Sequence, residues 1–273
     1  MRLLLFITAV LAIAGLSAQS VEPDSSMLKK HVEYFASQEL NGRLPGTVGY
    51  ELAVQYSMDY LENLGVKPFT PDYWPQRFPI DVNIINDANM YIGDPGHEEE
   101  LKLGTDFSVR GYSGSGTVVS EVVFCGYGFD NGVYSDYQDV DVAGKIVMVF
   151  KGSPAFIEGG PRLSIREKAD IAYNKGAKAI IFVSEPNGGR PQYQPIGSVM
   201  HGDGPMHQDM PQVQVSIDIA NTLIKIKELT LSEIQTKIDS SKAPQSFNTK
   251  SIATIKVFAD YKEDGHSMNL VGV

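Results

Sequence analysis

The fold of this chain is decided by Gly144-Lys-Ile-Val-Met-Val-Phe-Lys-Gly152, where five consecutive apolar residues lie between glycine boundaries. Such a run is typical of a strand buried on both faces. A helical pattern follows from Arg162 to Lys175, and Gly176 stands where a left-handed C-terminal residue belongs. Ala179-Ile-Ile-Phe-Val183 is a second buried strand. Strand, helix and strand predict a βαβ unit with parallel strands and a right-handed crossover, and therefore an α/β fold class with some α+β character.

Further elements are expected on both sides of this unit. Their ranges are strands at 88–92 and 117–124, a polar surface excursion at 185–212, a strand at 213–217, a helix around Leu223 that Asp218 could cap, and a helix near 232–238.

Two amphipathic helices are expected near the N-terminus, on either side of a loop rich in glycine and proline from Gln38 to Gly49. Asp24 or Ser25 can cap the first helix, Thr47 can cap the second, and Gly65 can end it. The apolar spacing that predicts them runs through Leu28, His31, Val32 and Phe35, then through Ala53, Tyr56, Tyr60, Leu61 and Leu64.

At the C-terminal end, apolar runs at 253–258 and 268–273 flank Lys262-Glu-Asp-Gly265 and predict an antiparallel hairpin. A single strand pair cannot bury its own apolar face. We therefore expect the sheet to continue beyond Val273, so that the chain is the N-terminal portion of a longer protein.

Residues 1–20 are typical of a secretory signal peptide, with Arg2 before an apolar run from Leu3 to Leu16 that is too short to span a bilayer. A retained N-terminal anchor is the alternative. We expect an exported protein, extracellular or periplasmic, that is soluble after cleavage. The net charge of -10 argues against nucleic acid or an anionic membrane as a partner.

No usual catalytic motif is complete. Gly126-Tyr-Gly128 begins a dinucleotide fingerprint, but Asn131 stands at the third glycine. The one cysteine, Cys125, lies in an apolar run and is expected to be a buried hydrophobe rather than a nucleophile. His31 falls on an apolar helix stripe, where a core histidine or one at a domain boundary is expected.

Ligand-type side chains gather once, at His201, Asp203, His207 and Asp209. They lie in a loop rich in glycine and proline, which offers no rigid second shell for a metal. We therefore expect no metal site in this chain.

Several motifs carry a resemblance to a known domain. They are Cys125-Gly-Tyr-Gly-Phe-Asp130, Tyr134-Ser-Asp-Tyr137, Asp141-Val-Ala-Gly-Lys-Ile-Val147 and Lys175-Gly-Ala-Lys-Ala-Ile180. In this order they resemble the core of a protease-associated (PA) domain.

The flanking segments extend the resemblance. Glu39-Leu-Asn-Gly-Arg-Leu-Pro-Gly-Thr-Val-Gly49, followed by a helix and Leu64-Gly-Val-Lys-Pro68, resembles the N-terminal signature of secreted zinc-dependent aminopeptidases that carry an inserted PA domain. Asn269-Leu-Val-Gly-Val273 is similar to the Asn-Val-Ile-Gly segment that opens their catalytic sheet.

The resemblance implies a hydrolase with two zinc ions bridged by water, held by His, Asp and Glu, with a further Glu as general base. The family's first ligand histidine follows the Asn-Val-Ile-Gly strand, so it is expected beyond Val273. No catalytic or metal-ligating residue can therefore be assigned in this sequence. Arg43 is the one residue that we place near a substrate cleft, as a weak substrate-binding candidate.

The sequence thus predicts a signal peptide at 1–20, N-terminal helices of a peptidase domain at 21–80, a PA domain at 81–246 and the first peptidase strands at 247–273. The parent protein would be an aminopeptidase that acts on peptide or protein substrates, and this portion alone would be inactive. The alternative is a stand-alone PA-domain module that binds a protein or peptide without catalysis. Oligomeric state is not predicted.

Overall fold

The computed structural model describes residues 24–70, 74–157, 162–188 and 206–273, so the expected signal peptide at 1–20 lies outside the described residues. The helices are α2 (Ser25–Phe35), the 3-10 helix η1 (Gln38–Arg43), α3 (Val48–Asn63), α4 (Ile165–Asn174), α5 (Ile217–Leu223), the 3-10 helix η2 (Lys225–Lys227) and α6 (Leu231–Ser241). The strands are β1 (Pro75–Pro79), β2 (Val82–Ile92), β3 (Glu99–Leu101), β4 (Phe107–Val109), β5 (Gly116–Phe124), β6 (Ile146–Phe150), β7 (Ala179–Val183), β8 (Gln212–Val215), β9 (Phe247–Lys262) and β10 (His266–Leu270).

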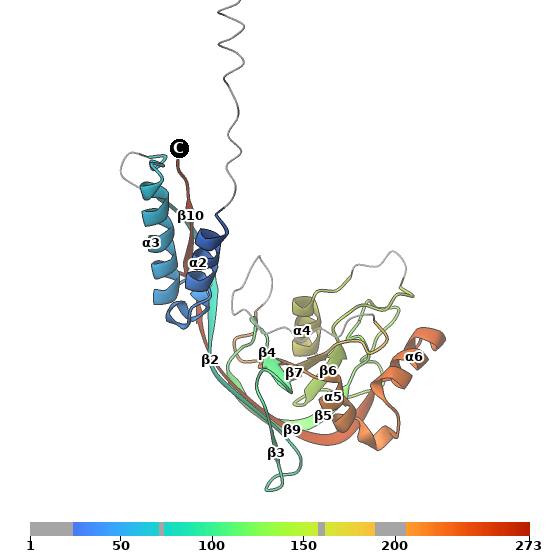
Figure 1. The fold of residues 1–273 in the computed structure, drawn as a ribbon. Coiled ribbons are helices and arrows are strands. Elements are labelled where there is room, and N and C mark those ends of the chain that lie inside the picture. The colour runs from blue at the N-terminus through green and yellow to red at the C-terminus, as the bar shows by residue number, and fades with distance from the viewer. Residues whose placement is uncertain (1–23, 71–73, 158–161, 189–205) are drawn as a thin grey trace, which may run out of the picture.

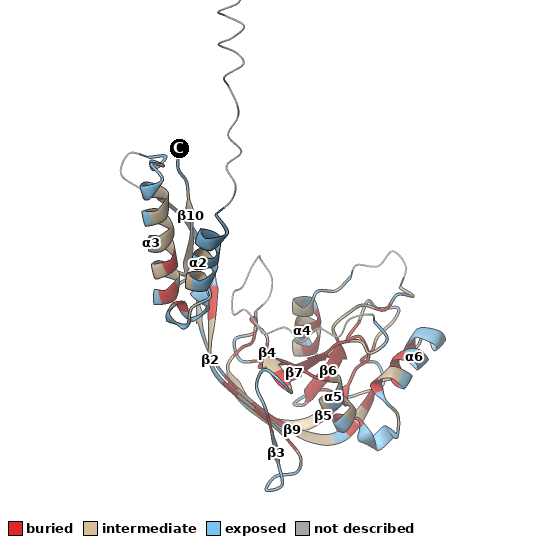
Figure 2. Cartoon of the chain, in the orientation of Figure 1, coloured by how far each residue is buried: buried red, intermediate tan, exposed pale blue. Residues whose placement is uncertain are grey.

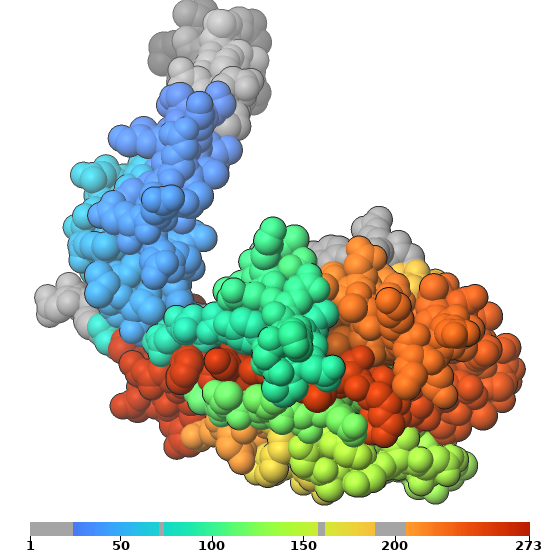
Figure 3. Space-filling model, turned by 90° about the horizontal axis from the view of Figure 1, so that it is seen from below, coloured from blue at the N-terminus to red at the C-terminus, as the bar shows by residue number. Residues whose placement is uncertain are grey.

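These elements form two bodies in Figure 1. Helices α2 and α3 with strands β1 and β10 make one, which we call the helical unit. The other strands and helices α4, α5 and α6 make the second, which we call the sheet domain. Strands β2 and β9 run side by side from one body towards the other. In the space-filling view an open notch separates the blue helical unit from the green part of the sheet domain (Figure 3).

The helical unit confirms the two helices expected on either side of the loop. The carboxylate of Asp24 accepts the backbone N–H groups of Ser26 and Met27 and so caps α2. Thr47 stands at the N-cap of α3, but its hydroxyl donates to the carbonyl of Leu44 and makes no capping bond to the helix. Gly65, with a φ of 79°, follows the end of α3 in the left-handed region.

The expected hairpin between 253–258 and 268–273 is wrong. Strand β9 pairs with β2 and β5, and β10 pairs with β1 in a separate two-stranded sheet. The interruption at 263–265 faces a shorter interruption at 80–81, where the N–H of Ile80 donates to the carbonyl of Gly265. The turn residues therefore form an irregularity within one long antiparallel ribbon. They do not reverse the chain into a hairpin, because β9 pairs with β2 and β10 pairs with β1.

The sheet domain is built on eight strands in the order β3-β2-β9-β5-β6-β7-β8-β4. Strands β5, β6, β7 and β8 are parallel neighbours, and the βαβ unit predicted from the sequence is confirmed by the pairing of β6 with β7. All five residues of each of these two strands are buried. Strand β9 lies between β2 and β5, so residues 247–262, which were expected in the peptidase sheet, share the sheet of the expected PA domain.

Helices cover both faces of the parallel strands, and Figure 2 shows the buried residues concentrated there. On one face α4 packs through Ala169 and Ala172, and on the other α5 and α6 pack through residues such as Leu223 and Ile234. Burial of an aliphatic side chain contributes about 1.5–3 kcal/mol, so these two layers stabilise the domain.

Two helix starts differ from the expected ones. Helix α4 begins at Ile165, because Ser164 and Glu167 form a capping box, and not at Arg162. Helix α5 is capped by Ser216, whose hydroxyl accepts the N–H of Ile219, and not by Asp218. Within the described residues, no helix is both long enough and apolar enough to cross a membrane.

Candidate functional site

The loop between α2 and α3 holds three successive residues in the left-handed region. Their φ angles are 40° at Asn41, 80° at Gly42 and 57° at Arg43. Leu40 anchors the loop because its side chain is fully buried. The backbone of Leu40 lies so close to Gly49 at the start of α3 that a Cβ at position 49 would collide with the Leu40 carbonyl. Such a backbone conformation costs free energy and is held in place by its surroundings.

Arg43, the candidate substrate-binding residue, is exposed at the end of this loop. Its guanidinium lies over the ring of Phe35, 5.7 Å from the ring centroid. The ring of Phe35 meets Tyr56 of α3 edge to face, with centroids 5.4 Å apart. The loop and both helices therefore position Arg43 at the surface.

His31 lies in the aromatic contact between α2 and α3. Its Nδ1 is 2.8 Å from the hydroxyl of Tyr56, and its ring meets Tyr60 edge to face at 4.4 Å. Its Nε2 is buried and has no hydrogen-bond partner within the described residues. The structure therefore places this histidine in the packing of the helical unit.

Helix α3 also contacts β10. The N–H of Met268 donates to the hydroxyl of Tyr50 at 2.7 Å, and the same hydroxyl lies 3.0 Å from Oγ of Ser267. Beside them, Nε2 of His266 lies 2.8 Å from Nη1 of Arg77 and 3.7 Å from Oε1 of Glu51. These polar contacts fix the helix against the two-stranded sheet.

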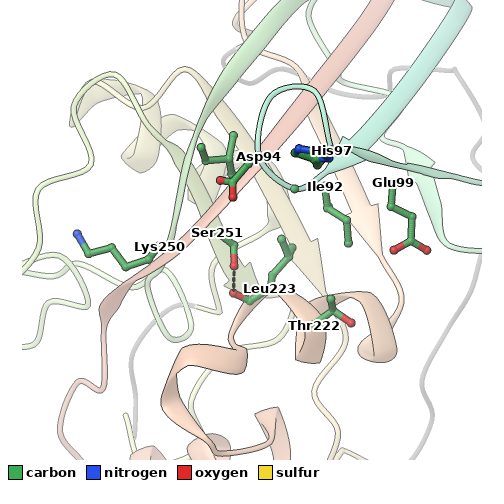
Figure 4. A pocket seen from close by; sticks show the side chains of 10 residues that line it. Ile92, Asp94, His97, Glu99, Thr222, Leu223, Lys250 and Ser251 are labelled. Atoms are coloured by element: carbon green, nitrogen blue, oxygen red, sulfur yellow. Dashed lines mark hydrogen bonds between the residues drawn. The ribbon is translucent and has the colours of Figure 1, made fainter.

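A pocket of about 400 Å³ opens at the edge of the sheet domain, between the β2–β3 turn, the end of α5 and the first part of β9 (Figure 4). It is lined by Ile92, Gly93, Asp94, His97, Glu99, Thr222, Leu223, Lys250, Ser251 and Ile252.

This pocket brings together a serine, a histidine and an aspartate, but they do not form a catalytic triad. Oγ of Ser251 donates to the carbonyl of Leu223 at 2.8 Å, as the dashed line in Figure 4 shows. A triad needs a hydrogen bond from the serine to the histidine and another from the histidine to the acid. Among the described residues neither bond is present, and both Asp94 and His97 are exposed. The pocket has no activated nucleophile.

The cluster of ligand-type side chains noted in the sequence is only partly described, because His201 and Asp203 lie outside the described residues. His207 is 3.1 Å from the carboxylate of Asp170 and stacks on the ring of Tyr173, with centroids 3.7 Å apart. Its partners thus come from helix α4.

No three His, Cys, Asp or Glu side chains come together to hold a metal ion in the described part of the chain. The residues present there do not fit the two-zinc centre that the resemblance implies.

A polar network in the sheet domain surrounds the fully buried Asp136. Its carboxylate accepts the N–H groups of Tyr127 and Phe129 and the hydroxyl of Tyr134, at 3.1, 3.0 and 2.9 Å. Burial raises the pKa of Asp136 to about 6, although these hydrogen bonds act in the opposite direction. A Cβ at Gly126 would collide with this carboxylate, so the glycine is required there.

A fully buried lysine, Lys168 of α4, lies beside this network. Its ammonium donates to the carbonyls of Phe150 and Gly152 at the end of β6. Burial lowers its pKa to about 8, and the carboxylates of Glu185 and Asp136 oppose the shift. Lys168 therefore positions the β6 end and is not reached by solvent.

Neither group was predicted from the sequence. Asp136 belongs to the Tyr134–Tyr137 motif but was not singled out, and Lys168 shares a helix face with Ile165, Ala169 and Ala172. A lysine on an apolar stripe is the signal that could have found it. Cys125 is buried as expected, and burial raises the pKa of its thiol well above the ordinary value, which argues against a nucleophile.

A comparison with known protein families matches the part of the chain that contains this network. Residues 115–223 match the family model of the PA domain, a range that runs from the start of β5 to the end of α5. The chain therefore contains a PA domain, as its motifs predict. Asp136 and Lys168 both lie within it.

Solved structures provide a second comparison. The chain is similar to a peptidase M28 precursor from Shewanella amazonensis, with 14% identity, a TM-score of 0.44, and coverage of 89% of this chain and 51% of that one. Two structures of BSAP, a zinc aminopeptidase from Bacillus subtilis, give 17% and 18% identity, TM-scores of 0.44 and 0.41, and coverage of 89% of this chain and 46% of theirs. The chain thus spans about half the length of these structures. A search of the curated proteins finds no match.

Proposed function

We propose that this chain is the N-terminal portion of an exported zinc-dependent aminopeptidase that acts on peptides or proteins, and that the portion includes the enzyme's PA domain. The observation that carries the proposal is the place of the PA domain within the chain. The matched residues 115–223 lie between α3 and β10, two elements that contact each other through Tyr50 and Met268. The PA domain is therefore an insertion into another unit, in the order that the Glu39–Gly49 motif implies.

The helical unit supports the same proposal, because it leaves apolar side chains uncovered. None of the residues of α2 is buried, although the helix carries an apolar stripe. The most exposed apolar side chains of the described unit are Leu28, Val32, Val48, Leu64, Phe69 and Val273, between 58% and 76% accessible. Exposed apolar residues gathered in one small unit mark a surface for a further partner. We propose that the catalytic sheet of the parent enzyme packs there and brings the two zinc ions.

The proposal is tested by comparing two proteins, this 273-residue chain and the product of its gene extended downstream. Both are dialysed against zinc, their metal content is measured by mass spectrometry, and turnover of aminoacyl anilides is assayed. We expect turnover and two zinc ions from the extended protein only. Stoichiometric zinc and turnover in the shorter chain would contradict the proposal, and the loop around His207 would become the candidate centre.

We further propose that Arg43 lies at the rim of the substrate cleft of the parent enzyme. Its support is its exposure and its placement by Phe35. Arg43→Ala in the extended protein should raise KM for peptides while leaving zinc content unchanged. Lys30→Ala on the exposed side of α2 is the matched control, because it also removes one exposed cation. An unchanged KM in Arg43→Ala would exclude this role.

The second candidate function is a stand-alone module whose PA domain binds a protein or peptide without catalysis. It is favoured by the sheet domain itself, which has helices on both faces and its own buried core. Hydrogen exchange distinguishes the two functions. Fast exchange at 266–273 beside slow exchange at 146–150 and 179–183 favours the peptidase portion. Equal protection in a monodisperse monomer favours the module.

A further inference from the structure

The pocket at the β2–β3 turn is built from three segments of chain that are bonded to one another. The N–H of Gly93, at the end of β2, donates to the carbonyl of Ile252 on β9 at 3.0 Å. Oγ of Ser251, also on β9, donates to the carbonyl of Leu223 at the end of α5 at 2.8 Å. Because β9 is tied to both other segments, the cavity of about 400 Å³ is formed before any ligand arrives.

The turn on one side of the pocket is tight. Gly93 has a φ of 122°, and a Cβ there would lie 2.8 Å from the carbonyl of His97. The N–H of His97 donates to the carbonyl of Asp94 at 2.9 Å, and the N–H of Gly96 donates to the carboxylate of Glu98 at 2.8 Å. These bonds fix the backbone from which Asp94 and His97 reach the pocket.

The floor of the pocket is apolar, and a carboxylate stands on either side of it. Ile92 and Leu223 line the pocket and are only 6% and 1% exposed. Glu99 lies directly opposite Ile92 in the pairing of β2 with β3, so the two side chains share one face of the sheet. Figure 4 shows Ile92 between Asp94 and Glu99.

The two carboxylates that line the pocket are unoccupied. Neither Asp94 nor Glu99 makes a side-chain hydrogen bond or ion pair with another residue that the structure describes. The two neighbouring glutamates differ, because Glu98 accepts a backbone N–H of the turn and Glu100 accepts the hydroxyl of Tyr91 at 3.4 Å. In this acidic segment the carboxylates without a partner are therefore the ones at the pocket.

Lys250, the lysine that lines the pocket, does not neutralise these carboxylates. Its Nζ lies 3.9 Å from Oε1 of Glu121, which is not a lining residue. In Figure 4 the side chain of Lys250 extends away from Asp94 and Glu99. Among the residues described at this pocket, negative charge is therefore left unbalanced.

We infer that this pocket binds an alkylammonium group, with the alkyl chain on Ile92 and Leu223 and the ammonium facing the carboxylates of Asp94 and Glu99. An ammonium offers three N–H donors, and hydrogen bonds between charged groups are stronger than those between neutral ones. The apolar floor favours an organic cation over an inorganic one, because each buried CH₂ group strengthens binding about fourfold. The proposed peptidase function assigns no role to this pocket.

The alkylammonium group can belong to a lysine side chain of a peptide or to a free alkylamine. Binding is measured by isothermal titration calorimetry on the full chain at low salt and neutral pH. The probes are acetyl-alanyl-lysyl-alanine amide, the same peptide with norleucine in place of lysine, butylamine and ammonium chloride. We expect saturable binding of the lysine peptide, of butylamine or of both, weaker binding of ammonium, and none of the norleucine peptide. Added salt should weaken binding, because the carboxylates are exposed.

Two variants and a control locate the site. Asp94→Asn and Glu99→Gln should each weaken binding about tenfold or more, the range for hydrogen bonds to charged groups. Glu100→Gln is the matched control, because it removes an exposed carboxylate from the same strand but does not line the pocket. It should leave binding unchanged. All three positions are exposed, so each variant should unfold at the urea concentration of the parent chain.

Four outcomes would overturn the proposal. The first is equal binding of the lysine and norleucine peptides, and the second is binding of ammonium as tight as that of the alkylammonium probes. The third is no saturable binding of any probe. The fourth is an equal loss of affinity in Glu100→Gln and Glu99→Gln, which would assign the binding to the acidic surface as a whole.

Discussion

The hydroxyl of Tyr50 accepts the backbone N–H of Met268 at 2.7 Å, which joins helix α3 to the last strand of the chain across 218 positions of sequence. Tyr50→Phe removes this acceptor and keeps the ring. An unsatisfied, partly buried N–H costs about 1–3 kcal/mol, so the helical unit should lose stability by about that amount. Faster hydrogen exchange at Met268 would report the loss.

Tyr91→Phe is the matched control for this change. The hydroxyl of Tyr91 makes only a long, exposed contact of 3.4 Å with Glu100 on the sheet domain. Its removal should change the unfolding free energy by less than about 0.5 kcal/mol. If Met268 exchanges at the same rate in Tyr50→Phe and in the parent chain, the hydroxyl does not secure β10.

Gly49→Ala should destabilise the corner that carries Arg43. The added methyl group has no space, because the carbonyl of Leu40 already lies against the glycine. Forced overpacking costs about 1–3 kcal/mol, and here the obstacle is backbone that cannot rotate away. Urea unfolding followed by tyrosine fluorescence measures the cost. Gly188→Ala, where the nearest atom is 3.4 Å from the new Cβ, is the control and should be close to neutral. Equal stability of the two variants would show that the loop can move aside.

The extent of the PA-containing unit can be tested by expression of two segments. The sequence predicts a boundary at residue 246, but β9 begins at 247 and joins β2 to β5. We therefore propose that residues 81–262 fold independently and that 81–246 do not, because the shorter segment lacks a strand inside the sheet. Thermal unfolding by circular dichroism decides between them. A cooperative transition in 81–246 would support the boundary at 246.

Asp136 should make stability depend on pH in mildly acidic solution. Its pKa is raised to about 6 in the folded protein, above the ordinary value of 3.8, so the folded state binds the proton more tightly than the unfolded state does. The stabilisation is fully present below the unfolded pKa and is lost as pH rises through the folded pKa. The free energy of unfolding should therefore fall by an amount on the order of 2 kcal/mol between about pH 4 and 6.5, because a tenfold difference in proton affinity is worth about 1.4 kcal/mol.

Asp136→Asn tests the assignment, because an amide oxygen can still accept the N–H groups of Tyr127 and Phe129. In urea titrations at several pH values, the variant should lack the decline that the parent chain shows in this window. The lysine beside it titrates elsewhere, since the pKa of Lys168 is lowered to about 8. A decline of the same size in both proteins would assign the pH dependence to another group.

The parts of the fold that follow from local pattern were predictable. The buried runs 146–150 and 179–183 and the helix between them needed only apolar periodicity and glycine boundaries. The partners of strands β9 and β10 could not be predicted in this way. Lys262-Glu-Asp-Gly265 has the composition of a tight turn, whether the chain reverses there or merely bulges. Only the competing strands β1 and β2, far away in sequence, decide between the two.

The candidate sites were less predictable for the same reason. Arg43 could be singled out from its motif, and the structure adds that Phe35 supports it. Asp136 was not predictable either, because its burial depends on the groups that bond to its carboxylate, the N–H groups of Tyr127 and Phe129 and the hydroxyl of Tyr134.

The ribbon of β2 and β9 has a consequence for how such a protein can arise. Its two strands leave the helical unit beside each other, at a point where Ile80 donates to the carbonyl of Gly265 at 3.0 Å. Because the first and last residues of the sheet domain lie beside each other, the domain adds almost nothing to the distance that the helical unit must span between them. The host chain could therefore have acquired the whole sheet domain in one event between two adjoining positions, and could lose it again, with its own strand pairing left intact.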